Sequence, residues 1–163
     1  MNAAKRENFQ RNVISKGILE ADDNDWILIS DLDEIPNLEN NDLKKFKSPL
    51  IFFKQQMMYY KFNLILENYS WLGTKACKKK NLKTPQWLRN IKDRPYPWWR
   101  IDTYFSSIKY INIKIIEEGG WHFSYIKSPE DIEKKLKSYL HHREYDMNPV
   151  GIENIRKMID NKK

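Results

Sequence analysis

Residues 26–36, Trp26-Ile27-Leu28-Ile29-Ser30-Asp31-Leu32-Asp33-Glu34-Ile35-Pro36, form an apolar run that ends abruptly in a cluster of carboxylates. The length and β-branched content of 26–29 predict a buried strand in the interior of a parallel sheet. Such a strand needs helices on both faces, so the sequence indicates an α/β fold. Pro36 lacks an amide donor and stops the strand.

Ligands of open α/β sheets bind beyond the carboxyl ends of the strands, where these acids stand. If the chain stays extended through Asp33, Asp31 and Asp33 point the same way. Two carboxylates on one side repel each other unless a cation lies between them, which favours Mg²⁺ or Mn²⁺. The alternative is a solvated turn whose acids cap a helix, because short motifs of this kind are common.

The chain has 163 residues, which predicts one domain, residues 1–163, with its own core. Its formal net charge of +7 suits polyanions, nucleotide phosphates or a membrane surface, although a bias toward Lys, Asn and Ile explains it equally well. Cys77 is the single cysteine, so we expect a reducing compartment and a small buried side chain. No secretory signal or membrane span is evident. We therefore expect a soluble cytoplasmic protein, or one that lies against a membrane surface.

Periodicity places the remaining elements along the chain. We expect helices at residues 5–20, 41–47 and 152–160, and strands at residues 50–60, 62–66, 110–116 and 121–126. A further helix begins after Ser128, with Pro129 at its first position, Asp131 closing a capping box, and a buried stripe of Ile132, Leu136 and Leu140. Residues 69–104 lack periodicity and are rich in aromatic and basic side chains, which predicts a long ordered loop.

His122 lies on the short strand that follows Gly119-Gly120, where backbone approaches a ligand closely. A neutral imidazole is a good ligand for Mn²⁺ beside carboxylates. The alternative is a hydrogen-bonded core histidine between Trp121 and Phe123.

Three motifs together resemble the family-17 glycosyltransferases, which include N-acetylglucosaminyltransferases that act on β-1,4-mannosyl glycoproteins. These motifs are Gln10-Arg11-Asn12, then Ile29-Ser30-Asp31-Leu32-Asp33-Glu34-Ile35-Pro36, and then Gly120-Trp121-His122-Phe123-Ser124-Tyr125 with Ser128-Pro129-Glu130 after it. The resemblance runs from about residue 5 to the last helix. It implies a GT-A-like mixed sheet with flanking helices, and inverting transfer of a sugar, N-acetylglucosamine from UDP-GlcNAc, to a glycan hydroxyl.

The resemblance also implies roles for individual residues. Asp33 and His122 would bind Mn²⁺ or Mg²⁺, Asp31 would bind the metal or the donor ribose, and Arg11 would contact the donor. A carboxylate must deprotonate the acceptor. The candidates are Glu118, which is close in sequence to His122, and Glu34, Asp102 and Glu117.

Sugars stack their apolar faces on aromatic rings, so Trp71, Trp87, Trp98 and Trp99 are candidates for acceptor binding, with core packing as the alternative. The family normally has a nucleotide-binding βα half before the helix that begins here near Lys5. We therefore expect a fold truncated at its N-terminus: a fragment, a misplaced gene start, or a chain completed by a second polypeptide.

Two other functions are open from the residues alone. One is a nucleic-acid-acting protein, in which Asp31, Asp33 and Glu34 bind a metal and the Lys/Arg/Trp region binds a strand, although we expect no nucleic-acid partner. The other is a non-catalytic glycan-binding remnant of a transferase.

Overall fold

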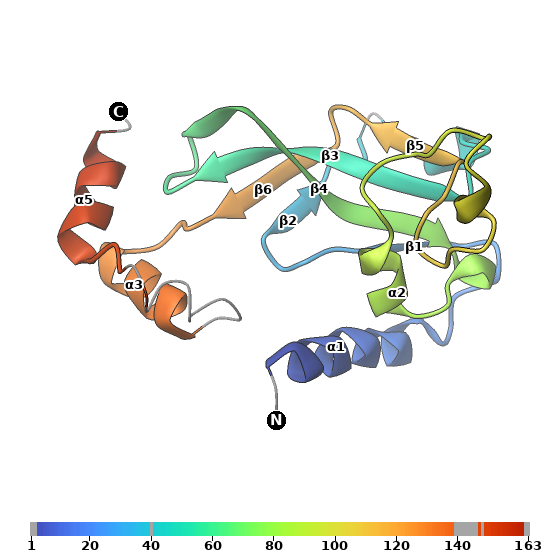
Figure 1. Cartoon of the computed structure of the whole chain (residues 1–163), viewed down its shortest axis with the longest axis horizontal. Coiled ribbons are helices and arrows are strands. Elements are labelled where there is room, and N and C mark those ends of the chain that lie inside the picture. The colour runs from blue at the N-terminus through green and yellow to red at the C-terminus, as the bar shows by residue number, and fades with distance from the viewer. Residues whose placement is uncertain (1–2, 40, 139–146, 148, 162–163) are drawn as a thin grey trace.

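A computed structural model describes residues 3–39, 41–138, 147 and 149–161 of the chain. It is a mixed α/β fold in which a curled mixed sheet is flanked by helices (Figure 1). The strands are β1 (Trp26–Ile29), β2 (Glu34–Pro36), β3 (Leu50–Tyr59), β4 (Ile65–Lys78), β5 (Ile113–Ile116) and β6 (Gly120–Ser124). The α-helices are α1 (Ala3–Val13), α2 (Pro85–Asn90), α3 (Pro129–Ser138) and α5 (Ile152–Asp160). Short 3-10 turns occupy Ile14–Ile18, Leu43–Lys45, Lys79–Asn81 and Ile101–Thr103.

Strand β3 organises the sheet, whose order is β1-β4-β3-β6-β2. It pairs antiparallel with β4 along its length, and parallel with β5 over its first half and with β6 over its second half. The sequence of β3 explains this position, because its first four residues, Leu50 to Phe53, are all buried. Burying each such side chain contributes about 1.5–3 kcal/mol to folding.

The core has two layers, one on each face of the sheet. On one face, Phe52 and Ile29 pack with Leu88 and Ile91, which come from α2 and the residue after it. On the other face, Phe53 packs with Ile116. Helices α1 and α2 lie together beneath the first face in Figure 1, whereas α3 and α5 pack on each other at the opposite end of the molecule. No described helix is long and apolar enough to cross a membrane.

Strand β1 corrects the expectation of a parallel interior strand. It pairs with β4, in antiparallel register from Trp26↔Lys78 to Ile29↔Lys75, and it stands at one end of the strand order. Its burial alternates, with Ile27 and Ile29 buried and the other two residues half-buried. A four-residue apolar run is compatible both with an interior parallel strand and with an antiparallel strand at the end of the order. Helix α2 covers the face of β1 that carries Ile27 and Ile29.

Residues 69–104 also differ from the expected loop. Strand β4 continues through this region to Lys78, and of the strand expected at 62–66 only residues 65 and 66 belong to it. Helix α2 follows, with Thr84 as its N-cap, accepting a hydrogen bond from the Trp87 amide at 3.0 Å, and Pro85 in its first turn. Periodicity was weak here because the outer half of β4 is largely exposed on both faces and its inner half, residues 73–77, is buried on both faces, so neither half alternates.

Other elements match the sequence closely. Helix α5 has the expected bounds, β6 starts one residue before the expected strand and ends two residues before its end, and the capping box of α3 forms, with Ser128 Oγ accepting from the Asp131 amide at 3.1 Å. Leu140, expected on the buried stripe of that helix, lies outside the described residues. Residues expected as a helix at 41–47 form only the 3-10 turn Leu43–Lys45. Cys77 is fully buried, as expected.

Candidate functional site

The motif after β1 is a tight turn. The Glu34 amide donates to the Asp31 carbonyl at 3.0 Å, and the Glu34 carboxylate accepts from the Asp31 amide at 3.0 Å. Leu32 stands fully exposed at the tip. Asp31 and Asp33 therefore do not share one face of an extended strand, which corrects the geometry expected for a pair of metal ligands.

Strand β6 brings His122 to this turn. The register of β2 with β6 sets Glu34 opposite His122, and the Phe123 amide donates to the Asp33 carbonyl at 2.8 Å. Gly120 starts β6 with φ 119°, and a Cβ there would lie 2.0 Å from the Ile35 carbonyl oxygen. Only glycine allows that approach. In the Gly-Trp-His motif, the glycine is therefore needed for its backbone conformation, and the histidine supplies the side chain.

Asp33 and His122 form a close pair. Their Oδ2 and Nε2 atoms are 3.6 Å apart, and the imidazole is largely buried while the carboxylate is half-exposed. The contact with His122 lowers the pKa of Asp33 against a smaller opposing effect of burial. The other imidazole nitrogen, Nδ1, is buried and has no hydrogen-bond partner among the described residues. Nε2 is the nitrogen that faces Asp33.

Arg89, on α2, ties the other two acids of the motif together. Its guanidinium donates to both oxygens of Glu34, each at 2.9 Å, and to Oδ2 of Asp31 at 2.9 Å. It also donates to the carbonyl of Gly73 on β4. Burial alone would lower the pKa of Arg89, but these acidic partners raise it. Arg89 is therefore a permanent cation that neutralises Glu34.

Glu34 is buried and saturated with donors. Besides Arg89 and the Asp31 amide, Trp71 Nε1 donates to it at 2.8 Å. The Trp71 ring also lies against the His122 ring, with centroids 5.5 Å apart. A carboxylate in this state fixes its neighbours in place and has no free oxygen to take a proton from an acceptor. Trp71, predicted to bind the acceptor, lies in this cluster, bonded to Glu34 and packed against His122.

Asp31 receives a second guanidinium from the N-terminal helix. Arg11 Nη2 lies 3.0 Å from Asp31 Oδ1 and 3.0 Å from Glu7, and its Nη1 donates to Gln86 at 2.8 Å. A cavity of about 290 Å³ opens beside this contact, lined by Glu7, Gln10, Arg11, Ile14, Ser30, Asp31 and Leu32. The structure thus joins two of the sequence motifs at one place.

The remaining predicted carboxylates lie elsewhere. Asp102 is exposed and paired with Arg100 and Lys109, which hold its pKa well below the usual value. Glu118 makes no hydrogen bond or ion pair within the described part of the chain, whereas Glu117 pairs with Lys54 at 2.7 Å.

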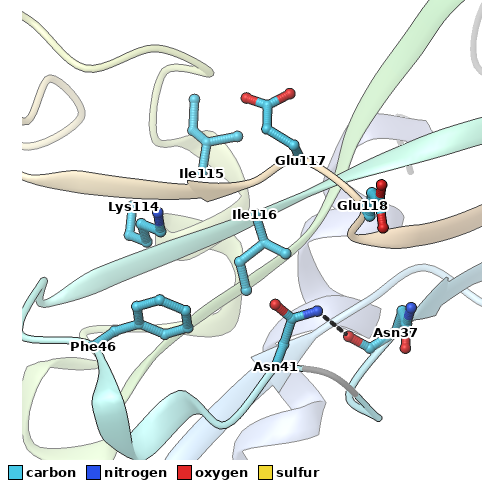
Figure 2. A pocket seen from close by; sticks show the side chains of 8 residues that line it. All are labelled: Asn37, Asn41, Phe46, Lys114, Ile115, Ile116, Glu117 and Glu118. Carbon is cyan, nitrogen blue, oxygen red and sulfur yellow. Dashed lines mark hydrogen bonds between the residues drawn. The ribbon is translucent and has the colours of Figure 1, made fainter.

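Glu118 lines a cavity of about 400 Å³ together with Asn37, Asn41, Phe46, Lys114, Ile115, Ile116 and Glu117 (Figure 2). An adjoining hollow of about 200 Å³ reaches Trp121. Neighbouring side chains on a strand alternate, so Trp121 lies on the face of β6 opposite His122. The cavity of Figure 2 is therefore separate from the Asp33–His122 pair.

The other tryptophans predicted to bind the acceptor lie in two different environments. Trp87 packs edge-on against Tyr110, and its Nε1 donates to the Ser107 carbonyl at 2.7 Å. Trp98 and Trp99 are exposed and contact each other edge-to-face. They lie in the segment that joins α2 to β5, away from the partners of Trp71.

Arg89 and Lys75 are the residues of the site that sequence reasoning missed. Lys75 is buried, and its Nζ donates to the carbonyls of Arg89 at 2.9 Å and Ile91 at 2.6 Å, which holds the C-terminal end of α2. The available signal was Thr84-Pro85, a helix start that would have placed Arg89 one helical turn further on.

The donor set determines which ion would fit. No group of three or more His, Cys, Asp and Glu side chains suited to a metal occurs in the described ranges. Asp33 and His122 are one oxygen and one nitrogen donor, a pair that suits Mn²⁺ when a ligand supplies further oxygens. Comparisons of the chain with protein-family models, curated proteins and solved structures give no match.

Proposed function

We propose that this chain is a metal-dependent glycosyltransferase domain of the GT-A type, which uses a nucleotide-sugar donor and transfers the sugar with inversion to a glycan hydroxyl. By the family resemblance, the donor is UDP-GlcNAc and the metal is Mn²⁺ or Mg²⁺. In this proposal the described site is the part of the domain that holds the metal and the diphosphate of the donor.

The observation that carries the proposal is the Asp33–His122 pair. Two motifs far apart in sequence place a carboxylate oxygen and an imidazole nitrogen 3.6 Å apart. A diphosphate and water would complete the coordination, since Mn²⁺ accepts mixed nitrogen and oxygen ligands. Nε2, the imidazole nitrogen that faces Asp33, would be the ligand atom.

The arginines supply the second part of the proposal. Arg11 and Arg89 put two guanidinium groups around Asp31, beside the cavity that Gln10 and Leu32 also line. Guanidinium groups bind phosphate through paired hydrogen bonds. We therefore propose that Arg11, the more accessible of the two, contacts the donor, and that Asp31 orients it.

The residues act as follows in the reaction. Asp33 and His122 would hold the metal, and a bound metal would supply positive charge for the departing nucleoside diphosphate. Glu34 and Trp71 keep Arg89 and His122 in place. Of the candidate bases, Glu34, Asp102 and Glu117 are engaged by cations, and Glu118 lines a cavity on the face of β6 opposite the metal pair. A base must lie within hydrogen-bond reach of the attacking hydroxyl, so the proposal assigns no base among these four carboxylates.

Isothermal titration of UDP with and without Mn²⁺ tests the proposal. We expect binding that requires Mn²⁺, and a loss of about tenfold or more in Asp33→Asn and in His122→Gln, because metal ligands contribute at least that much to affinity. Asp23→Asn, a matched change at an exposed turn, should bind like the wild type.

Each contrary result has a meaning. UDP binding that is unaffected by Mn²⁺ or by Asp33→Asn would refute the metal site. Salt-sensitive binding of an oligonucleotide without UDP binding would favour the nucleic-acid function. Glycan binding with neither UDP nor metal binding would favour the non-catalytic remnant.

A further inference from the structure

Five large apolar side chains stand in solvent within one short segment. We name residues 98–105 the aromatic tip. Its members Trp98, Trp99, Ile101, Tyr104 and Phe105 are between 65% and 87% exposed. Folded proteins rarely expose so many large apolar groups together unless the patch meets a partner. The function proposed above gives this segment no role beyond the acceptor stacking predicted for Trp98 and Trp99.

The aromatic tip is held in shape by its own hydrogen bonds. The Arg100 guanidinium donates two hydrogen bonds to the Asp102 carboxylate, at 2.7 and 2.8 Å, and the Thr103 hydroxyl donates to the Arg100 carbonyl at 2.6 Å. The Arg100 amide closes a turn onto the Pro97 carbonyl at 3.1 Å. The exposed rings are therefore presented by an ordered turn.

Cations surround the base of the tip. Arg94, Arg100 and Lys109 lie 5.1, 5.6 and 5.8 Å from the centre of the Tyr96 ring. The nearby acids are compensated, because Asp102 is paired with Arg100 and Lys109, and Asp93 with the buried Lys75 at 2.6 Å. Lys92 adds another positive charge in the same segment. The tip thus combines an apolar end with a positively charged collar.

We propose that the aromatic tip is a membrane-docking surface, which inserts its rings among the headgroups of a bilayer that contains anionic lipids. Trp, Tyr and Phe side chains favour the membrane–water interface, and a basic collar is attracted to anionic headgroups. Figure 1 agrees with this arrangement, because the segment that joins α2 to β5 lies at the end of the molecule opposite α3 and α5. Docking there would leave those helices in water.

A lipid surface fits the chemistry of the tip better than a glycan. A sugar site needs polar groups beside the ring that are ready to bond hydroxyls. In the tip, the guanidinium of Arg100 and the carboxylate of Asp102 are already bonded to each other.

Co-sedimentation with large vesicles tests the proposal. The wild-type chain should bind vesicles of phosphatidylcholine with about 30% phosphatidylserine, bind pure phosphatidylcholine much more weakly, and release from the mixed vesicles at high salt. Trp98→Ala/Trp99→Ala should weaken partitioning by about tenfold or more, because two interfacial rings are lost. Arg94→Gln should weaken it about fivefold, since each basic residue near the surface contributes about 1 kcal/mol.

Two further variants keep the result interpretable. Phe9→Ala removes a similarly exposed ring from α1 and should partition like the wild type. Trp98→Phe/Trp99→Phe should still bind, but should lose most of the blue shift in tryptophan emission that vesicles cause in the wild type. Far-ultraviolet circular dichroism confirms that each variant is folded.

Any of three results would overturn the proposal. These are no binding of the wild type to mixed vesicles, equal binding by the double alanine variant, and equal binding to neutral and anionic vesicles. A glycan or an oligonucleotide that shifts the emission of Trp98 and Trp99 in the absence of vesicle binding would assign the tip to that partner instead.

Discussion

Replacing Arg89 with Met is the sharpest test of how the site is held together. The Glu34 side chain is only 1% exposed and receives two hydrogen bonds from Arg89. Each bond to a charged group contributes about 1.5–3 kcal/mol. The contact with the half-exposed Asp31 adds at most about 1 kcal/mol. Removing one partner of a buried ion pair costs about 3–5 kcal/mol. We therefore expect Arg89→Met to lower the free energy of unfolding by that amount.

This loss is large for a domain of this size. Domains unfold with about 5–15 kcal/mol, so Arg89→Met would remove between about a fifth and all of that stability. Urea titration followed by tryptophan fluorescence measures the change. Arg94→Met removes an exposed guanidinium that contacts the Tyr96 ring, and it should change stability by less than about 1 kcal/mol.

The effect of pH identifies the cause. In Arg89→Met the Glu34 carboxylate is buried without a cation, and burial disfavours its charged form. Its folded state then binds a proton more readily than its unfolded state, so the variant should recover stability as the pH falls from about 7 to about 5. The wild type should not gain stability over that range.

A double-mutant cycle separates the pair from its surroundings. Glu34→Gln in the Arg89→Met background removes the uncompensated charge, while the Gln carbonyl still accepts from Trp71. We expect the double variant to be at least about 2 kcal/mol more stable than additive losses would give. Additive losses, or an Arg89→Met variant as stable as Arg94→Met, would refute the claim that Arg89 neutralises a buried carboxylate.

Three other changes are predicted from the same face of the sheet. Gly73→Ala should destabilise the chain by about 1–3 kcal/mol in urea titration, because its Cβ would lie 2.0 Å from Oε1 of the fully buried Gln55. Lys75→Met should cost about 2–4 kcal/mol at neutral pH. Burial lowers the pKa of Lys75 below 10.5, so the folded state holds the proton less tightly, and the stability of the wild type relative to Lys75→Met should rise as pH approaches that value. Burial raises the pKa of the Cys77 thiol to about 12, so at pH 8 a disulfide reagent should react only as the chain unfolds, at a rate that urea increases.

Local signals predicted the elements whose ends are marked by their own residues. The Ser128-Pro129 capping motif and the apolar spacing of residues 152–160 are such cases, and both elements form as expected. The prediction that β1 pairs with parallel neighbours was wrong, because an apolar run of four residues has no feature that distinguishes a parallel from an antiparallel neighbour. The direction of the neighbouring strand is decided by the pairing of β1 with β4, and β4 lies far along the chain.

The sequence predicted the acids and the histidine of the candidate site, but not the ion pairs that hold them in place. The sequence indicated Asp31, Asp33, Glu34 and His122, and the structure gathers them around one turn. It did not indicate Arg89, because one arginine in a basic, aromatic segment resembles its neighbours until α2 sets it against two carboxylates.

The three acids of the motif consequently have different tasks, and this decides how substitutions there should be interpreted. Glu34 holds Arg89, Arg89 and Arg11 hold Asp31, and Asp33 alone is left facing His122. Loss of nucleotide binding in a Glu34 or Asp31 variant would therefore follow from displaced arginines as readily as from a lost ligand. Only a substitution of Asp33 or His122 that leaves stability unchanged tests the metal, and the pair must lose binding together if they hold the same ion.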